Sequence, residues 1–293
     1  MASTRIRILC ENRAGLPRHI LGEHGFSAWI HHRGKKILLD TGQGQTLAPN
    51  ARALKIDLST LDHLVISHGH YDHMGGIGQL PRQKRPIPLH AHPDIFIPKY
   101  LRPRPGDRPH FVGSPLKPEW MEEKLNLKME LTRVLTQISP GIWFSGEIPR
   151  VNDFEPQDSR LLRLSRGEEK MGTKAMETDP MVDDTALLLE THAGPVILTG
   201  CAHAGIVNTM EHFSSQLNMD TFHAVIGGTH LEFAPGSKAR TALRLTQTME
   251  ALDRFQVQHI ALSHCTGNKA AAALYNRFKE RVAFANAGWT ALF

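Results

Sequence analysis

Cysteine is scarce in this sequence, with three among 293 residues, at positions 10, 201 and 265. Their irregular spacing excludes a small secreted protein held together by a disulfide framework. No run approaches the roughly 20 apolar residues that a membrane-spanning helix needs. The first ten residues also lack the apolar stretch and the small-residue cleavage site of a signal peptide. We therefore expect a cytoplasmic protein with no membrane partner.

Aromatic residues are also few, at 6% of the chain, and no basic strip is interleaved with them. Surfaces that bind nucleic acids combine basic and aromatic side chains, so we do not expect a nucleic-acid partner. The formal net charge is nevertheless +5, and residues 81–118 carry eight Lys or Arg against two acidic residues. This segment could frame a phosphate-bearing substrate or could be a solvated basic loop. The charge favours an anionic small-molecule partner without specifying one.

Histidine, in contrast, is abundant: the chain has 18, and His68, His70 and His73 lie within six residues together with Asp72. This cluster follows the apolar run 64–66 and precedes a glycine pair. Imidazole nitrogens and carboxylate oxygens are ligands of Zn²⁺ and similar divalent metals, and a strand that ends in a turn lets such side chains converge. We expect His68 and His70 to face one metal ion, and Asp72 and His73 to reach a second. The alternative is a histidine-rich surface loop.

Three further histidines also follow apolar runs. The runs span residues 195–199, 222–226 and 257–262, and the histidines that follow them are His203, His230 and His264. Because a sheet can bring strand ends to one edge, we expect these side chains to converge with the first motif. The alternative for each is a buried histidine bonded to the backbone.

Hydrophobic periodicity predicts both strands and helices. The main predicted strands span residues 5–10, 26–30, 36–40, 61–66, 186–190, 195–199, 222–226 and 257–262. The predicted helices span 46–54, 205–217, 237–255 and 269–282, with another near 94–100. Residues 101–118 are rich in proline, glycine and arginine, so we expect a long functional loop or lid there rather than a regular element. The order fits packed layers of sheets and helices in one domain, residues 1–293.

The pattern His68-x-His70-x-Asp72-His73 resembles the signature of the metallo-β-lactamase superfamily. The wider chain is similar to the subgroup that resembles 7,8-dihydropterin-6-methyl-4-(β-D-ribofuranosyl)aminobenzene-5′-phosphate synthase. The resemblance covers nearly the whole chain and includes the later motifs at residues 199–206, 227–231 and 263–267. It implies an α/β fold of the αββα sandwich type, in which two mixed β-sheets are flanked by helices.

The resemblance also implies a ligand set and a cofactor. His68, His70 and His203 would belong to a first metal ion, and Asp72, His73 and His264 to a second. The cofactor would be two divalent metal ions, Zn²⁺ first, with Mn or Fe as alternatives. Many relatives carry a bridging aspartate near the position that Cys201 occupies here. Asp184 is a candidate to replace that aspartate.

Other polar residues could serve the site without binding metal. Asp40 would accept a proton from a ligating imidazole, unless it only shapes its turn. Glu147 could border the site, although ordinary turn chemistry explains it nearly as well. His230 is assigned to substrate phosphate or to proton transfer, because its loop is rich in glycine. Cys201 and Cys265 could be ligands or nucleophiles, or else small buried spacers.

The expected function is metal-dependent hydrolysis or transfer at an anionic, phosphate- or ester-bearing small molecule. A metal pair lowers the pKa of bound water from its bulk value toward about 7, and Asp72 could orient that water as well as bind metal. The resemblance implies the narrower reaction of joining a dihydropterin to a ribofuranosylaminobenzene phosphate. The alternatives are a metal-dependent nuclease or phosphodiesterase, a mononuclear iron oxygenase, and a non-catalytic protein that keeps a structural metal. The oligomeric state stays open.

Overall fold

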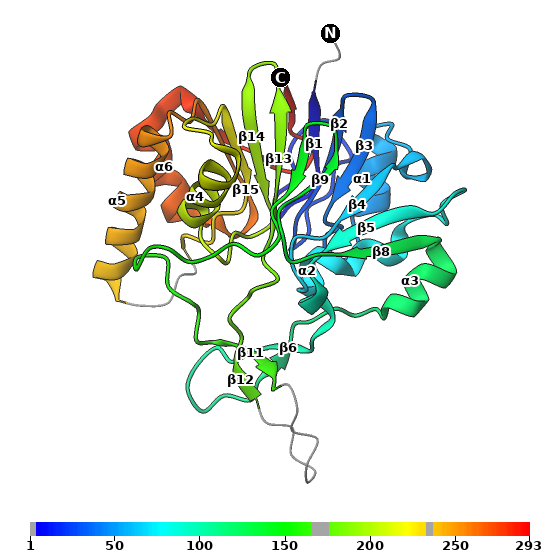
Figure 1. The fold of residues 1–293 in the computed structure, drawn as a ribbon, viewed down its shortest axis with the longest axis horizontal. Coiled ribbons are helices and arrows are strands. Elements are labelled where there is room, and N and C mark those ends of the chain that lie inside the picture. The colour runs from blue at the N-terminus through cyan, green and yellow to red at the C-terminus, as the bar shows by residue number, and fades with distance from the viewer. Residues whose placement is uncertain (1–3, 166–175, 233–236) are drawn as a thin grey trace.

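Two seven-stranded sheets dominate the computed structural model, which describes residues 4–165, 176–232 and 237–293 (Figure 1). The first sheet has the order β18 (Thr290–Leu292), β1 (Arg5–Cys10), β2 (Ser27–His32), β3 (Lys35–Leu39), β4 (His63–Val65), β5 (Ile87–Ala91) and β8 (Leu127–Leu131). The second has the order β17 (Val282–Phe284), β16 (His259–Leu262), β15 (Ala224–Gly227), β14 (Gly194–Thr199), β13 (Ala186–Thr191), β10 (Ile142–Phe144) and β9 (Thr136–Ser139).

Both sheets follow the same plan, antiparallel on one side and parallel on the other. In the first sheet, β3, β4, β5 and β8 are parallel neighbours, while β1 and β2 pair antiparallel with theirs. In the second sheet, β14 to β17 are parallel and β9, β10 and β13 are antiparallel. Parallel strands point the same way, so the loops after β14, β15 and β16 gather at one edge of their sheet.

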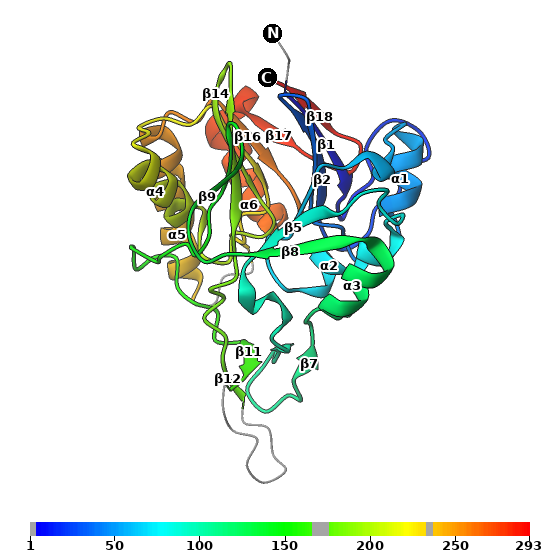
Figure 2. The same cartoon turned by 45° about the vertical axis from the view of Figure 1, so that its right-hand side comes forward.

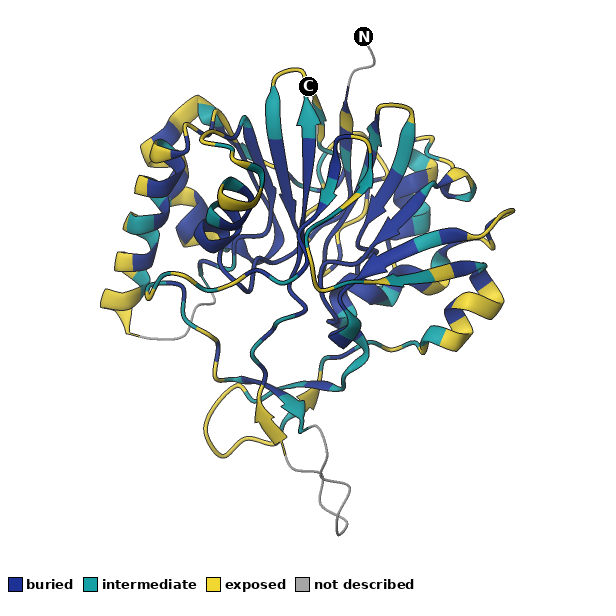
Figure 3. Cartoon of the chain, viewed as in Figure 1, coloured by how far each residue is buried: buried dark blue, intermediate teal, exposed yellow. Residues whose placement is uncertain are grey.

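The core lies between the two sheets and beneath the helices on each outer face. Along β13, Leu187 and Leu189 pack between the sheets, whereas Leu188 packs under the helices. Burial on both faces explains why the central strands are apolar at almost every position. Helices α4 (Ile206–Leu217), α5 (Lys238–Arg254) and α6 (Asn268–Phe278) cover the second sheet, and α1 (Leu47–Ala53) and α3 (Pro118–Leu125) cover the first (Figures 1 and 3). The αββα sandwich is therefore confirmed.

The long helices agree with their sequence patterns. On α4, Ile206, Met210 and Phe213 are buried on one side, and the helix ends at Asn218 in the left-handed conformation that closes many helices. Helix α5 begins after Ser237, whose side chain accepts a hydrogen bond from the Arg240 N–H. No described helix combines the length and the hydropathy that a membrane crossing requires.

Three predictions of secondary structure were wrong. The helix expected near 94–100 is a short 3₁₀ turn, Pro93–Phe96, followed by strand β6 (Lys99–Leu101). Residues 101–118, expected to be irregular, contain strand β7 (His110–Phe111). The last helix ends at Phe278 rather than at 282, and two unpredicted strands, β17 and β18, follow it. These strands are only two or three residues long and pair with distant segments, so no local periodicity reveals them.

Strands β6 and β7 belong to a third, four-stranded sheet with the order β12 (Met176–Thr178), β11 (Leu161–Leu164), β6 and β7. It extends from the edge of the sandwich that carries α2 (Tyr71–Met74), as the two views show (Figures 1 and 2). Residues 166–175, between β11 and β12 in the sequence, lie outside the described residues. The lid expected at residues 101–118, which include β7, stays a prediction.

A buried ion cluster joins the small sheet to the histidine motif. Lys99, only 1% exposed, places its Nζ 2.6 Å from Asp179 Oδ2 and 2.8 Å from Asp183 Oδ1. The other carboxylate oxygen of Asp183 accepts a hydrogen bond from the Gly69 N–H at 2.8 Å. Gly69 lies between His68 and His70, so the position of β6 is coupled directly to that of the histidine motif.

Candidate metal centre

The histidine motif is a sharp turn from β4 into α2. His70 is extended, with φ −91° and ψ 149°, and directly precedes the single helical turn that contains Asp72 and His73. Gly69 is required for close packing, because a Cβ atom there would lie 2.1 Å from the carbonyl oxygen of Ile95. The turn therefore directs four polar side chains into one small buried volume.

The first ligand group contains His68, His70 and His203. One nitrogen from each lies within 4.8 Å of the others. Ser67 Oγ is 2.9 Å from His68 Nδ1, which leaves His68 Nε2 directed toward the group. This nitrogen, His70 Nε2 and both ring nitrogens of His203 are buried and have no hydrogen-bond partner among the described residues. An unsatisfied buried polar atom costs about 1–3 kcal/mol, so a cation shared by the three imidazoles would offset this cost for one nitrogen of each ring.

The electrostatics of this group also suit a metal. Burial and the neighbouring imidazoles hold the pKa of His68 and the pKa of His203 well below the usual histidine value. Burial lowers the pKa of His70 to about 3. All three rings are therefore neutral at physiological pH, and their nitrogen lone pairs are available to bind a metal ion.

The second ligand group is centred on the Asp72 carboxylate. Its Oδ2 lies 3.3 Å from His264 Nε2, 3.8 Å from His73 Nε2 and 3.2 Å from His24 Nε2. Burial opposes ionisation of Asp72, but His73, His24 and His264 outweigh it and hold the pKa well below the usual aspartate value. His24, whose side chain is about half exposed, was missed in the sequence because no motif surrounds it.

Asp40 lies directly behind His73. Its Oδ2 is 2.7 Å from His73 Nδ1, and its two oxygens also accept hydrogen bonds from the backbone and the hydroxyl of Ser67. Burial opposes the charge on His73, yet Asp40 and Asp72 together raise the pKa of His73 to about 9 in the metal-free protein. This arrangement directs His73 Nε2 toward Asp72, which is the geometry expected of a carboxylate that orients a ligand.

Glu11 and Asn12 hold His264 in the same way, and sequence reasoning missed this role. Asn12 Oδ1 is 2.9 Å from His264 Nδ1, and Glu11 Oε1 accepts a hydrogen bond from the His264 backbone N–H at 2.7 Å. These contacts leave His264 Nε2 facing Asp72. The available signal was a polar pair directly after the buried strand β1, at a strand end where functional side chains often lie.

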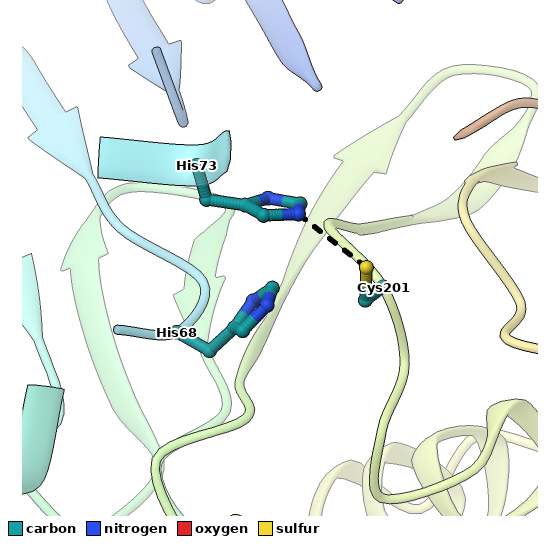
Figure 4. Close-up of side chains that lie close together, drawn as sticks. All are labelled: His68, His73 and Cys201. Carbon is teal, nitrogen blue, oxygen red and sulfur yellow. Dashed lines mark hydrogen bonds between the residues drawn. The ribbon is translucent and has the colours of Figure 1, made fainter. Parts of the chain in front are cut away.

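Cys201 lies between the two ligand groups. Its Sγ is 3.4 Å from His73 Nε2, and it forms a potential ligand set with His68 and His73 (Figure 4). Asp184, the predicted replacement for a bridging aspartate, accepts a hydrogen bond from the Ala204 N–H at 2.8 Å. Burial raises the pKa of Asp184 to about 7. Its contacts are thus with the backbone of the His203 loop, and its role as a ligand stays a prediction.

The remaining two candidates occupy different surroundings. The His230 ring lies against that of His203, with centroids 4.3 Å apart, and near both Cys201 and Cys265. Glu147 instead accepts a hydrogen bond from His92 Nε2 at 2.8 Å and pairs with Arg133. The structure brings His230 to the histidine cluster and places Glu147 in a separate polar group. Neither functional assignment is tested by these positions.

Three site residues have left-handed backbone conformations, which bulky side chains seldom adopt. The φ angles are 56° at Asp40, 49° at His230 and 47° at His264. Each such residue costs of order 1–3 kcal/mol and persists only where the surroundings enforce it. The occurrence of three such residues at this site indicates that the placement of their side chains, rather than the intrinsic preference of the backbone, determines the local structure.

Comparison with known proteins agrees with this geometry. The sequence pattern of the metallo-beta-lactamase superfamily matches residues 21–259. The chain belongs to this superfamily. The 7,8-dihydropterin-6-methyl-4-(beta-D-ribofuranosyl)-aminobenzene-5'-phosphate synthase of Methanocaldococcus jannaschii is 30% identical over 288 residues, which cover 94% of this chain and 92% of that protein.

Solved structures support the same assignment. Tm1679, described as a metal-dependent hydrolase of the beta-lactamase superfamily, has a TM-score of 0.79 at 25% identity, with 98% of each chain covered. The metallo-beta-lactamase fold protein YhfI from Bacillus subtilis has a TM-score of 0.55 at 12% identity over the full length of both chains. The second likeness shows the fold alone. Together with the sequence match, these structures confirm the family resemblance.

Proposed function

We propose that this superfamily member is a metal-dependent hydrolase or transferase that acts on an anionic small molecule. The first of two divalent ions would be held by His68, His70 and His203, and the second by Asp72, His73 and His264. The observation that carries the proposal is the cluster of buried imidazole nitrogens without partners, directly beside the Asp72 group. One group alone would support a single-metal site, whereas two adjacent groups support a pair.

The donors fit borderline divalent metals. Neutral imidazoles with one carboxylate suit Zn²⁺ best, and Mn or Fe remain compatible alternatives. When bound, such ions supply Lewis acidity and an activated water nucleophile. Cys201 adds a softer donor beside His73, which favours Zn²⁺ over Mn.

The protein's own side chains orient the ligands and handle protons. Asp40 and Asn12 each fix the tautomer of a ligating histidine, so that Nε2 of His73 and of His264 faces the Asp72 carboxylate. Asp72 would also orient the attacking water. His230, beside His203, is assigned to proton transfer or to an anionic group of the substrate.

The small sheet supports an anionic substrate. Tyr71, between His70 and Asp72, donates its backbone N–H to the Val112 carbonyl at 3.0 Å, so the end of β7 lies against the histidine motif. The same segment exposes Arg104, Arg108 and Lys117. A phosphate-bearing molecule would find complementary charge beside the proposed metals. The Methanocaldococcus relative is named for a product that carries a 5'-phosphate, which agrees with this class.

The test begins with metal analysis of protein purified in chelator-free buffer. Elemental mass spectrometry should find two tightly held equivalents of Zn or Mn per chain. The same protein is assayed on phosphate monoesters, phosphodiesters and the pair of a dihydropterin with 4-(β-D-ribofuranosyl)aminobenzene 5′-phosphate. His70→Ala and Asp72→Ala should abolish turnover of any substrate that the wild type converts. His259→Ala, which removes an exposed histidine, should not. Full activity in both site variants would refute the proposal.

Two alternatives give different results in the same experiment. A single equivalent of iron with oxygen uptake would favour a mononuclear iron oxygenase. Turnover of phosphodiesters or RNA with strongly salt-dependent affinity would favour a nuclease. The separate Asp72 group argues against the first of these, because an oxygenase needs only one facial set of ligands.

A further inference from the structure

Cys201, His230 and Cys265 form a third cluster of potential ligands beside the two already described. One donor atom from each lies within 4.8 Å of the other two. They follow β14, β15 and β16, three parallel neighbours, so the sheet itself brings them together. Both cysteines are buried, at 4% and 5% exposure, and neither forms a disulfide.

The backbone is shaped to let the two thiols approach each other. They meet over Gly228, which directly follows β15, the strand between them. A Cβ atom at Gly228 would lie 2.6 Å from Cys265 Sγ and 3.2 Å from the Cys201 Cα. Any side chain at this position would therefore push Cys265 away from Cys201.

The present contacts of the sulfurs are weak and replaceable. The Cys265 thiol donates to the Cys201 carbonyl at 3.3 Å, and Cys201 Sγ lies 3.4 Å from His73 Nε2. Thiols are poor hydrogen-bond donors and acceptors but become strong metal ligands when they lose a proton. In tetrahedral zinc sites Zn–S is about 2.3 Å and Zn–N about 2.0–2.1 Å, so donors around one ion are spaced by roughly 3.5–4 Å. The observed cluster needs only small side-chain movements to reach that spacing.

We propose that Cys201, His230 and Cys265 form a third cation site, selective for borderline or soft divalent ions such as Zn²⁺, Co²⁺ or Cd²⁺. Binding one ion gives a neutral complex of two thiolates and one neutral imidazole, and any proton that the sulfurs or the imidazole still hold leaves to solvent. The site does not depend on the proposed reaction. An ion bound here would use both Cys201 and His230 as ligands. It would therefore withdraw Cys201 from the position beside His73, and His230 from the proton transfer or anion binding proposed above.

The experiment is a Co²⁺ titration of the metal-free full-length protein, followed by ultraviolet absorption. Thiolate ligands give an intense charge-transfer band that imidazole and carboxylate ligands do not give. We expect three equivalents, with the full band reached only at the third. Cys265→Ser should lose that equivalent and at least half of the band, while it keeps the first two equivalents. Cys10→Ser, which alters a buried cysteine outside the cluster, should match the wild type.

Unchanged stoichiometry and band in Cys265→Ser would overturn the proposal. If this variant does not fold, X-ray absorption of the wild type with three Zn equivalents decides, because the third ion must contribute two sulfur neighbours. Fewer than two sulfur neighbours per protein chain, summed over the three ions, would overturn the site. Failure of the two-metal proposal gives a different result in the same titration. The protein would then bind one thiolate-ligated ion and would lack the other two equivalents.

Discussion

Asp40→Asn tests the electrostatic role of the carboxylate behind His73. Asparagine keeps the size of the side chain and can still accept a hydrogen bond from the Ser67 N–H, but it removes the charge 2.7 Å from His73 Nδ1. In the metal-free wild type, Asp40 and Asp72 raise the pKa of His73 to about 9, against an ordinary value of 6.5. The variant should bring this pKa back to or below its ordinary value.

The sign follows from proton linkage. Because the folded-state pKa of His73 is above the unfolded one, its contribution to stability is fully present below about pH 6.5 and is lost as the pH rises through about 9. A difference of about 2.5 pH units corresponds to about 3 kcal/mol. Asp40→Asn should therefore destabilise the metal-free protein relative to wild type by about 3 kcal/mol more at pH 6 than at pH 9.5. Any constant cost of the substitution cancels in this comparison.

Urea unfolding in chelator, from pH 6 to pH 9.5, measures this change. Asp62→Asn provides the matched control, because Asp62 pairs with exposed Arg85 at 2.6 Å and such surface pairs contribute only about 0–1 kcal/mol. Its difference from wild type should be small and nearly independent of pH. A difference between wild type and Asp40→Asn that stays constant over this range would refute the proposed coupling of Asp40 with His73.

Three further predictions concern other parts of the site. His203→Ala should lose one tightly held metal equivalent by elemental analysis, and an unchanged metal content would exclude His203 as a ligand. Lys99→Met leaves two buried carboxylates without their cation and should lower the free energy of unfolding by about 3–5 kcal/mol. An unchanged free energy in urea unfolding would show that the ion pairs with Asp179 and Asp183 do not stabilise the fold. Burial raises the pKa of Asp184 to about 7, so its contribution to wild-type stability should fall as the pH rises from about 4 to about 7. Asp184→Asn should remove about 4 kcal/mol of that fall in metal-free urea titrations, and an equally steep fall in the variant would contradict this prediction.

The sequence could predict those site residues that belong to a local motif, in which an apolar strand is followed by a turn that carries a histidine. His68, His203 and His264 each follow an apolar run. Parallel pairing of β14, β15 and β16 explains why His203 and His264 lie at one edge of their sheet. The packing of the two sheets brings His68, which follows β4 of the other sheet, into one group with His203. Asn12 and His24 were missed because their function arises from contact with His264 and Asp72, far away in the chain. A single polar residue in a loop carries no local pattern that marks such a contact.

The fold shows the same division. Burial on both faces gave β13 and β14 long apolar runs, and amphipathic spacing defined α4. The small sheet had no such signal, because its short strands pair segments about 60 residues apart, such as Tyr100 with Leu162. Its anchor is one buried charge, Lys99, which sequence reasoning could count only as part of a basic stretch.

The two groups of proposed ligands differ in the protonation state of their histidines, and this difference would determine the order in which the proposed ions bind. In the first group burial keeps all three rings neutral, so an entering ion displaces no proton. In the second group an ion must displace the proton that Asp40 and Asp72 hold on His73, with a pKa of about 9. At pH 7 this competition weakens binding at the second group by about two powers of ten, and the penalty disappears as the pH approaches 9. The same carboxylate that orients His73 would therefore make binding of the proposed second ion more pH-dependent than binding of the first.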